Sequence, residues 1–298
     1  MNPFNGRSLL LGLTAGLAMT LSVYAADKTL LLIAAPPGHG SGEHEHNAGL
    51  LLLQKCLAPV AGLRVVVSRN GWPADEAALT SADAVVVFCD GDGGNLAFQG
   101  KHPQQLAALA RRGAGLGFIH WATQPPEGKS REDLHAWIGG SYDPNWSVNP
   151  FWEADFTKLP SHPVTRGVVP FKLRDEWYFH LRFVEELKGV TPILQAVAPA
   201  ETMSRPDGPH SGNPAARESV KRGDPQTVMW VCERPDGGCG FGFTGGHYHA
   251  NWGNDNYRKV VLNALTWIAR VEVPPEGIAS TATADDLRAN LDPKGQPR

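Results

Sequence analysis

Short runs of consecutive apolar residues recur in the first half of the chain and predict strands of a buried sheet. A strand covered on both faces is apolar at every position, whereas a half-exposed strand alternates between apolar and polar positions. Four runs fit the buried pattern: residues 29–35, 63–68, 84–89 and 115–119. Helical patterns lie between them, at 48–57 and 103–112. This alternation predicts an α/β fold, with a mostly parallel, doubly wound sheet covered by helices on both faces.

The second half of the chain has a looser pattern, and we expect it to contain a β-rich insertion. Strand-like segments occur among Pro- and Gly-rich loops at 151–157, 172–178 and 192–198. Residues 205–224 have little apolar content and are expected to form a long surface loop. Core strands return at 226–232 and 240–244, and apolar residues at helical spacing predict a last helix over 256–269.

The two ends of the chain differ from the rest. Arg7, an apolar run over 9–21 and small residues at Val23 and Ala25 have the three parts of a secretory signal peptide. The apolar run is shorter than the roughly 20 residues that a membrane anchor needs. We therefore expect residues 1–25 to be removed after Ala25, giving a periplasmic or secreted domain over 26–278 with no membrane span. Residues 279–298 are expected to be a disordered tail.

Composition narrows the possible partners. The 27 Lys and Arg residues nearly balance the 30 Asp and Glu residues, and no basic block is present, which argues against a nucleic-acid partner. Four Cys are too few for a disulfide-dense miniprotein. Cys232 and Cys239 flank a predicted hairpin turn, where they could form a disulfide or remain buried thiols. Eleven His and nine Trp form the unusual part of the composition.

The histidines are concentrated where a functional site is expected. Ligands of open α/β sheets bind beyond the carboxyl ends of the strands. Six of the eleven His follow predicted strands: His39, His44, His46, His120, His247 and His249. Asp90 follows the strand at 84–89. Imidazoles with nearby carboxylates favour zinc or another first-row divalent ion. Without a metal, the same groups could act as acids and bases near neutral pH.

Other residues support or exclude particular chemistries. Trp121, Trp177 and Trp252 lie beside the histidine segments, where they could pack in the core or stack on a sugar ring. Glu176 could reach the same edge. No G-x-S-x-G elbow is present, and the glycines at 38–42 lack the Lys of a phosphate-binding loop, so no nucleotide cofactor is expected.

Six short motifs, taken in order, resemble the ThuA-like (trehalose utilisation) family. They are HGSGEHEH at 39–46, GAGLGFIHWAT at 113–123, WIGGSY at 137–142, HPVTRGV at 162–168, DEWY at 175–178 and GFTGGHYHANW at 242–252. The resemblance implies a flavodoxin-like fold related to class I glutamine amidotransferases. His120 stands where the amidotransferase nucleophile would be, so glutaminase activity is not expected. The resemblance also implies a role in disaccharide and keto-sugar metabolism, and metal binding by residues matching His39, His44, His46, His120 and His247.

Our first hypothesis is an exported carbohydrate-active enzyme, a hydrolase or lyase that cleaves or rearranges a glycoside or keto-sugar. It assigns catalysis to His120, Glu176 and His247, and a divalent metal to His39, His44 and His46. It assigns substrate binding to Trp121, Asp90, Trp177, His249 and Trp252. The alternative is a non-catalytic periplasmic sugar-binding module. In both, the partner is a small-molecule carbohydrate, and the oligomeric state stays open.

Overall fold

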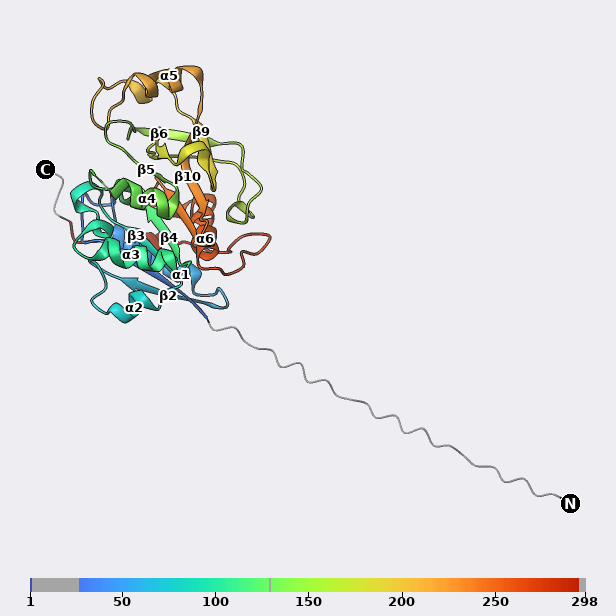
Figure 1. Ribbon diagram of the computed structural model, residues 1–298. Coiled ribbons are helices and arrows are strands. Elements are labelled where there is room, and N and C mark those ends of the chain that lie inside the picture. Colours follow the sequence, from blue (N-terminus) through green and yellow to red (C-terminus); the bar gives the residue numbers. More distant parts are fainter. Residues whose placement is uncertain (2–26, 129, 295–298) are drawn as a thin grey trace.

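A seven-stranded sheet forms the centre of the computed structural model (Figure 1), which describes Met1, residues 27–128 and residues 130–294. The strand order is β2-β1-β3-β4-β11-β10-β9. The bounds are β1 Lys28–Ala34, β2 Leu63–Ser68, β3 Ala84–Phe88, β4 Gly115–Ile119, β9 Val190–Val197, β10 Pro225–Glu233 and β11 Cys239–Phe243. Strands β2, β1, β3, β4 and β11 are parallel, and β10 is antiparallel to both of its neighbours. The expected mixed α/β fold with a mostly parallel sheet is confirmed.

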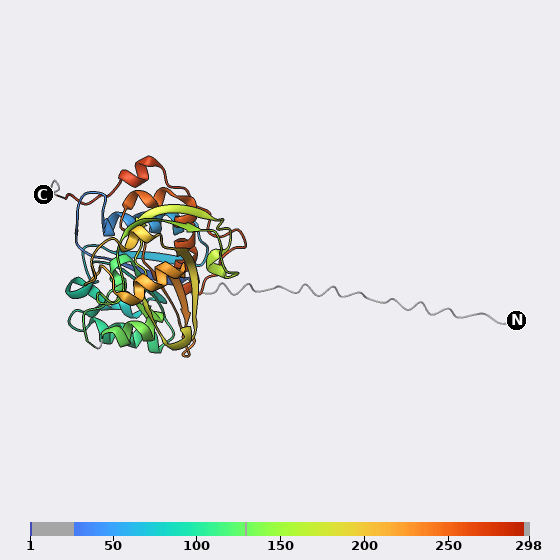
Figure 2. The same cartoon turned by 90° about the horizontal axis from the view of Figure 1, so that it is seen from above.

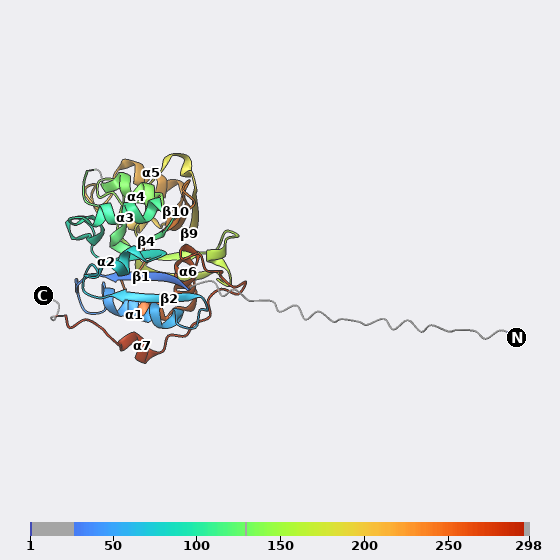
Figure 3. The same ribbon diagram turned by 60° about the horizontal axis from the view of Figure 1, so that its bottom comes forward.

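The central strands are apolar throughout because alternate side chains enter two different cores. Leu30 and Leu32 belong to the core that contains α1 (His46–Leu57) and α6 (Asp255–Ile268). Leu31 and Ile33 belong to the core that contains α3 (His102–Arg111) and α4 (Ser130–Ile138), while the short α2 spans Glu76–Thr80. Figure 3 shows α1 on one side of the sheet and α3 and α4 on the other.

The β-rich insertion consists of two small sheets. Strand β5 (Gly140–Ser141) pairs with β8 (Arg182–Phe183), and β6 (Phe151–Phe156) pairs with β7 (Phe171–Glu176). The expected surface loop over 205–224 is wrong, because α5 spans Pro214–Arg222. Its ends carry ordinary helix signals: the Asn213 side chain accepts a hydrogen bond from the Ala216 N–H, and Gly223 has a left-handed φ of 72°. Few of its side chains are buried, which explains its weak apolar pattern.

The tail does not have the expected disorder over residues 279–294. Helix α7 spans Ala284–Arg288 and begins at Thr283, whose side chain accepts a hydrogen bond from the Asp286 N–H. Leu287 packs against the apolar core, and the Asp292 N–H donates to Glu45 Oε2 at 2.8 Å. Figure 2 shows α7 (red) on the same side of the molecule as α1 (blue) and α6. A few specific contacts therefore hold a segment whose composition is polar.

Two expectations about compartment stay predictions. Almost all of the expected signal peptide, from residue 2 onward, lies outside the described residues. None of the helices in the described part of the chain combines the length and the apolar character needed to cross a membrane.

Cys232 and Cys239 do not form a disulfide, and all four Cys are free thiols. Cys232 is opposite Gly240, and Glu233 is opposite Cys239, so the two Cys are one register position apart. Because neighbouring positions of a strand face opposite ways, Cys232 lies in the core with α3 and Cys239 in the core with α6.

Asp175 connects the insertion to the loop after β11. It is fully buried, and its carboxylate accepts hydrogen bonds from the Gly246 N–H at 3.0 Å, the Tyr248 N–H at 3.4 Å and the Tyr257 hydroxyl at 2.8 Å. These bonds fix the backbone on both sides of His247. Asp175 is thus a structural residue rather than part of the site itself.

We expect Asp175→Ala to lower the free energy of unfolding by about 3 kcal/mol, because several buried donors lose their acceptor. Chemical denaturation followed by circular dichroism measures this loss. Asp155→Ala is the matched control: Asp155 is partly exposed on the neighbouring strand and pairs with Lys172. Its loss should stay below about 0.5 kcal/mol. Equal losses for the two variants would contradict the assigned role.

The thiols provide a second test of the fold. Burial raises the pKa of Cys89 to about 12 and that of Cys232 to about 11, so little thiolate is present at pH 8. Unreduced protein should therefore react slowly with Ellman's reagent when native and release four equivalents in denaturant. Two equivalents in denaturant would instead indicate a disulfide.

Candidate functional site

Three histidines and one glutamate meet at the carboxyl edge of the sheet. His120 directly follows β4, His247 lies in the loop after β11, His44 precedes α1, and Glu176 ends β7. His44 Nε2 lies 3.1 Å from both His120 Nε2 and His247 Nδ1. Glu176 Oε2 lies 3.0 Å from His247 Nδ1 and 3.5 Å from His120 Nε2. All four side chains are buried, and we call them the four-residue cluster.

Backbone contacts hold these segments together although they are far apart in sequence. The His44 N–H donates to the His247 carbonyl at 3.0 Å, and Glu43 forms an isolated antiparallel bridge with Tyr248. His44 and His120 have positive φ values of 44° and 57°, a region that residues other than glycine rarely occupy. Such backbone strain is concentrated at functional sites in proteins.

In two of the rings, the nitrogen that points away from the centre of the cluster already forms a hydrogen bond. His120 Nδ1 donates to the Thr244 carbonyl at 2.7 Å, and His44 Nδ1 donates to Asp90 Oδ1 at 2.9 Å. A neutral imidazole carries only one N–H. When both rings are neutral, the two Nε2 atoms therefore present lone pairs to each other at 3.1 Å, with no proton to share between them.

Electrostatics favour ligand-type protonation states for two members of the cluster, His44 and Glu176. Burial and the neighbouring imidazoles lower the pKa of His44, so its ring is neutral. Burial alone would protonate Glu176, but hydrogen bonds with His120 and His247 outweigh it and hold the pKa of this carboxyl at about 2. Burial lowers the pKa of His247, but the Glu176 carboxylate raises it more.

The donor set fits a divalent first-row metal ion. Neutral imidazoles and a carboxylate are the ligands that zinc and its neighbours take in proteins. Around zinc, with bonds of about 2.0–2.1 Å, tetrahedral ligand atoms lie roughly 3.3 Å apart. The four contacts in the cluster span 3.0 to 3.5 Å. Outer hydrogen bonds like those of His120 and His44 also orient metal-binding histidines.

The other expected metal ligands lie outside the four-residue cluster. His39 is exposed and stacks on His44, with ring centroids 3.6 Å apart. His46 is buried, and its Nε2 lies 3.7 Å from Asp90 Oδ1. Asp90, expected to bind substrate, instead accepts a hydrogen bond from His44. His39, His44 and Asp90 form a second, more exposed group of ligand-type atoms.

Three side chains expected to contact the substrate are buried by packing and lie outside the four-residue cluster. Trp177 is fully buried, donates to the Leu173 carbonyl at 3.0 Å and packs against Phe243. Trp252 is buried in the same apolar core. His249 is buried beside the C-terminal segment, near Glu45 and Leu287.

Trp121 remains at the edge of the cluster. It is half-buried, and its ring centroid lies 5.9 Å from that of His44. Its indole N–H donates to Gln124 Oε1.

The sequence patterns did not single out Tyr178, Asn149 or Phe151 as site residues. The Tyr178 hydroxyl lies 3.1 Å from His120 Nε2 and donates to Glu176 Oε2 at 3.3 Å. Asn149 Nδ2 donates to Glu176 Oε1 at 3.1 Å. Tyr178 lies in the DEWY motif, in which only the carboxylates were expected to reach the site. Asn149 and Phe151 have no spacing signal, since only the folded insertion brings them to Glu176.

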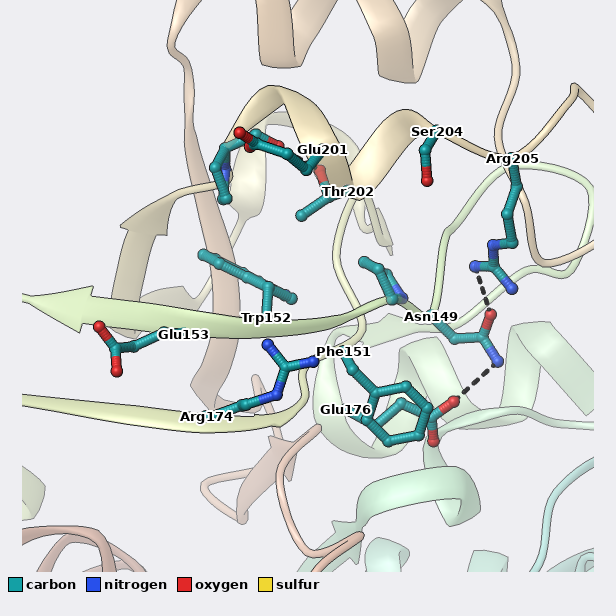
Figure 4. Close-up of a pocket in the computed structure, with 12 residues that line it drawn as sticks. Asn149, Phe151, Trp152, Glu153, Arg174, Glu176, Glu201, Thr202, Ser204 and Arg205 are labelled. Carbon is teal, nitrogen blue, oxygen red and sulfur yellow. Dashed lines mark hydrogen bonds between the residues drawn. The ribbon is translucent and has the colours of Figure 1, made fainter.

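A cavity of about 500 Å³ opens beside Glu176 (Figure 4), within the size range of small-molecule sites. Its lining includes Asn149, Phe151, Trp152, Arg174, Glu176 and Arg205. Phe151 is 41% exposed, and its ring centroid lies 4.9 Å from that of His247. Glu176 and Phe151 thus link the cavity to the four-residue cluster.

Comparison with known proteins agrees with this architecture. A ThuA-like protein from Bacteroides uniformis, 12% identical, aligns with a TM-score of 0.57 over 86% of this chain and 95% of that chain. A ThuA-like protein from Parabacteroides merdae, 14% identical, aligns with a TM-score of 0.54 over 88% and 99%. Among curated proteins, no significant match is found. The ThuA family, described as trehalose utilisation, matches residues 38–268. This match covers well over half of the chain, so the chain belongs to the ThuA family.

Proposed function

We propose that this protein is an exported, metal-dependent enzyme that cleaves or rearranges a glycoside or keto-sugar. The ThuA family's description, trehalose utilisation, supports a sugar substrate. The cavity beside the four-residue cluster has room for one. Export rests on the signal-peptide pattern at residues 1–25.

One observation carries the metal part of this proposal. His44 Nε2 and His120 Nε2 lie 3.1 Å apart while their outer nitrogens are engaged, so two neutral rings would direct lone pairs at each other. Two buried lone pairs at this distance repel unless a cation or a proton lies between them. We assign His44, His120, His247 and Glu176 as the ligands of a divalent ion. His120, Glu176 and His247, expected to act in catalysis directly, would then act by holding this ion.

The remaining residues have distinct roles in this proposal. When bound, a divalent ion supplies a Lewis acid that polarises a sugar oxygen. The Tyr178 hydroxyl donates its only proton to Glu176 Oε2 and would accept a hydrogen bond from a sugar hydroxyl. Asn149 holds the second oxygen of Glu176, which leaves the first oxygen toward the histidines. The exposed ring of Phe151 offers a face for a sugar ring.

Activity is tested by incubating the protein with keto-disaccharides and glycosides and searching for new products by mass spectrometry. Products that disappear with EDTA and return with zinc or another first-row ion would support the proposal. Saturable sugar binding without any product would favour the sugar-binding module instead. Full activity in metal-free protein would contradict the metal assignment.

The metal assignment also predicts a stoichiometry. Purified protein should bind about one divalent ion per chain, measured by elemental analysis after dialysis. His120→Ala and Glu176→Ala should reduce this content at least tenfold, because each removes a ligand. His102→Ala is the control, since His102 stacks on Trp72 at the start of α3. Unchanged metal in folded His120→Ala protein would refute the assignment.

Asn149 should influence metal affinity without contacting the metal. Removing a residue that orients a ligand typically weakens metal binding by about 10- to 100-fold. We expect an effect of this size for Asn149→Ala, measured by competition with a chromophoric chelator. Asn145→Ala, an exposed position in the same loop, should leave the affinity unchanged. Equal affinities for the two variants would show that Asn149 does not position Glu176.

A further inference from the structure

We infer that the cavity beside Glu176 binds a sugar that carries a negatively charged oxygen group, a carboxylate or a phosphate, through Arg174 and Arg205. This inference rests on the proposed function for the site, and adds the charge of the substrate and the residues that select it. The carboxylate and phosphate share the same chemistry toward arginine, so the experiment below distinguishes them.

The position of the cavity relates a bound sugar to the four-residue cluster. Glu176 lines the cavity and also contributes an oxygen to the cluster. Phe151 lines the cavity with a ring that meets His247 edge to face at 4.9 Å. A sugar ring stacked on Phe151 would therefore lie next to the cluster, with its substituents directed along the cavity.

The cavity lining holds two guanidiniums, those of Arg174 and Arg205, and three carboxylates, those of Glu153, Glu176 and Glu201. In Figure 4 the Arg174 guanidinium points between Trp152 and Phe151, whereas Glu153 and Glu201 direct their carboxylates away from these rings. Among the residues that the structure describes, Arg174 forms no side-chain ion pair.

The other two charged side chains of the lining, Glu176 and Arg205, differ in how many of their polar atoms already form hydrogen bonds. The Glu176 carboxylate is engaged on both oxygens, by Asn149 at 3.1 Å and by His247 at 3.0 Å. Arg205 uses one terminal nitrogen, Nη2, which donates to Asn149 Oδ1 and to the His210 carbonyl, both at 2.8 Å. The guanidiniums of Arg174 and Arg205 thus both keep N–H groups for a ligand.

Guanidinium groups suit an anionic substituent in particular. Their planar N–H groups bind carboxylate and phosphate oxygens in pairs, with stronger bonds than neutral hydroxyls form. Two cations beside one cavity also raise the local concentration of anions. A neutral sugar would gain little from either effect.

The test compares three sugars by isothermal titration calorimetry on metal-loaded protein: glucose, glucuronate and glucose 6-phosphate. We expect at least one anionic sugar to bind at least tenfold more tightly than glucose, and the tighter of the two identifies carboxylate or phosphate. Arg174→Gln should reduce the preference for the anionic sugar over glucose at least tenfold. Lys172→Gln is the matched control, because Lys172 lies two residues earlier on β7, loses the same charge and pairs with Asp155.

Glucose binding as tight as both anionic sugars would overturn the inference, and so would an Arg174→Gln variant that keeps the full preference. Metal content, measured on each sample, separates this result from the proposed function. Charge selectivity without bound metal would support the inference and refute the metal centre. Bound metal without charge selectivity would refute the inference alone.

Discussion

Burying three imidazoles and a carboxylate in one place is costly unless their polar atoms find partners. Three of the outer atoms do so: Thr244 and Asp90 accept from His120 and His44, and Asn149 donates to Glu176, whereas His247 Nε2 has no hydrogen-bond partner among the described residues. The inner atoms face one another at 3.0 to 3.5 Å. The rest of the site is arranged around this crowded interior, and the divalent ion that we propose would satisfy its inner lone pairs together.

The cluster depends on two parts of the chain that fold by different rules. The parallel sheet delivers His120 and His247, because the carboxyl ends of β4 and β11 lie side by side. The antiparallel insertion delivers Glu176 at the end of β7. Asp175 joins the two parts by accepting hydrogen bonds from the backbone around His247. This buried carboxylate is therefore one of the contacts that link the sheet to the insertion at the site.

The aromatic residues divide between core and site according to packing. Trp177 and Trp252 fill the core, although they lie beside site residues in sequence. Phe151 is exposed toward the cavity, because it begins β6 and alternates with the buried Trp152. The proposed face for a sugar ring thus belongs to a residue that composition and motif spacing did not indicate.

Local sequence patterns specify much of this protein. Runs of consecutive apolar residues identify the strands of the parallel sheet, because every side chain of a strand buried on both faces must enter one of two cores. The same strands place His44, His120 and His247 at one edge, because parallel strands end together. Cap residues at Asn213 and Gly223 also carried the signal for α5, although its apolar pattern was weak.

Tertiary structure alone decides how these residues are used. His44 belongs to the cluster because it contacts the His247 segment, some two hundred residues away in the chain. His39 and His46, close to it in sequence, lie outside the cluster. In the pairing of β10 with β11, Cys232 and Cys239 are one register position apart, so their side chains lie on opposite faces of the sheet. The contacts of Leu287 and Asp292 order a tail of polar composition. Periodicity records whether a position is buried, whereas the partner that a buried group meets depends on elements distant in sequence.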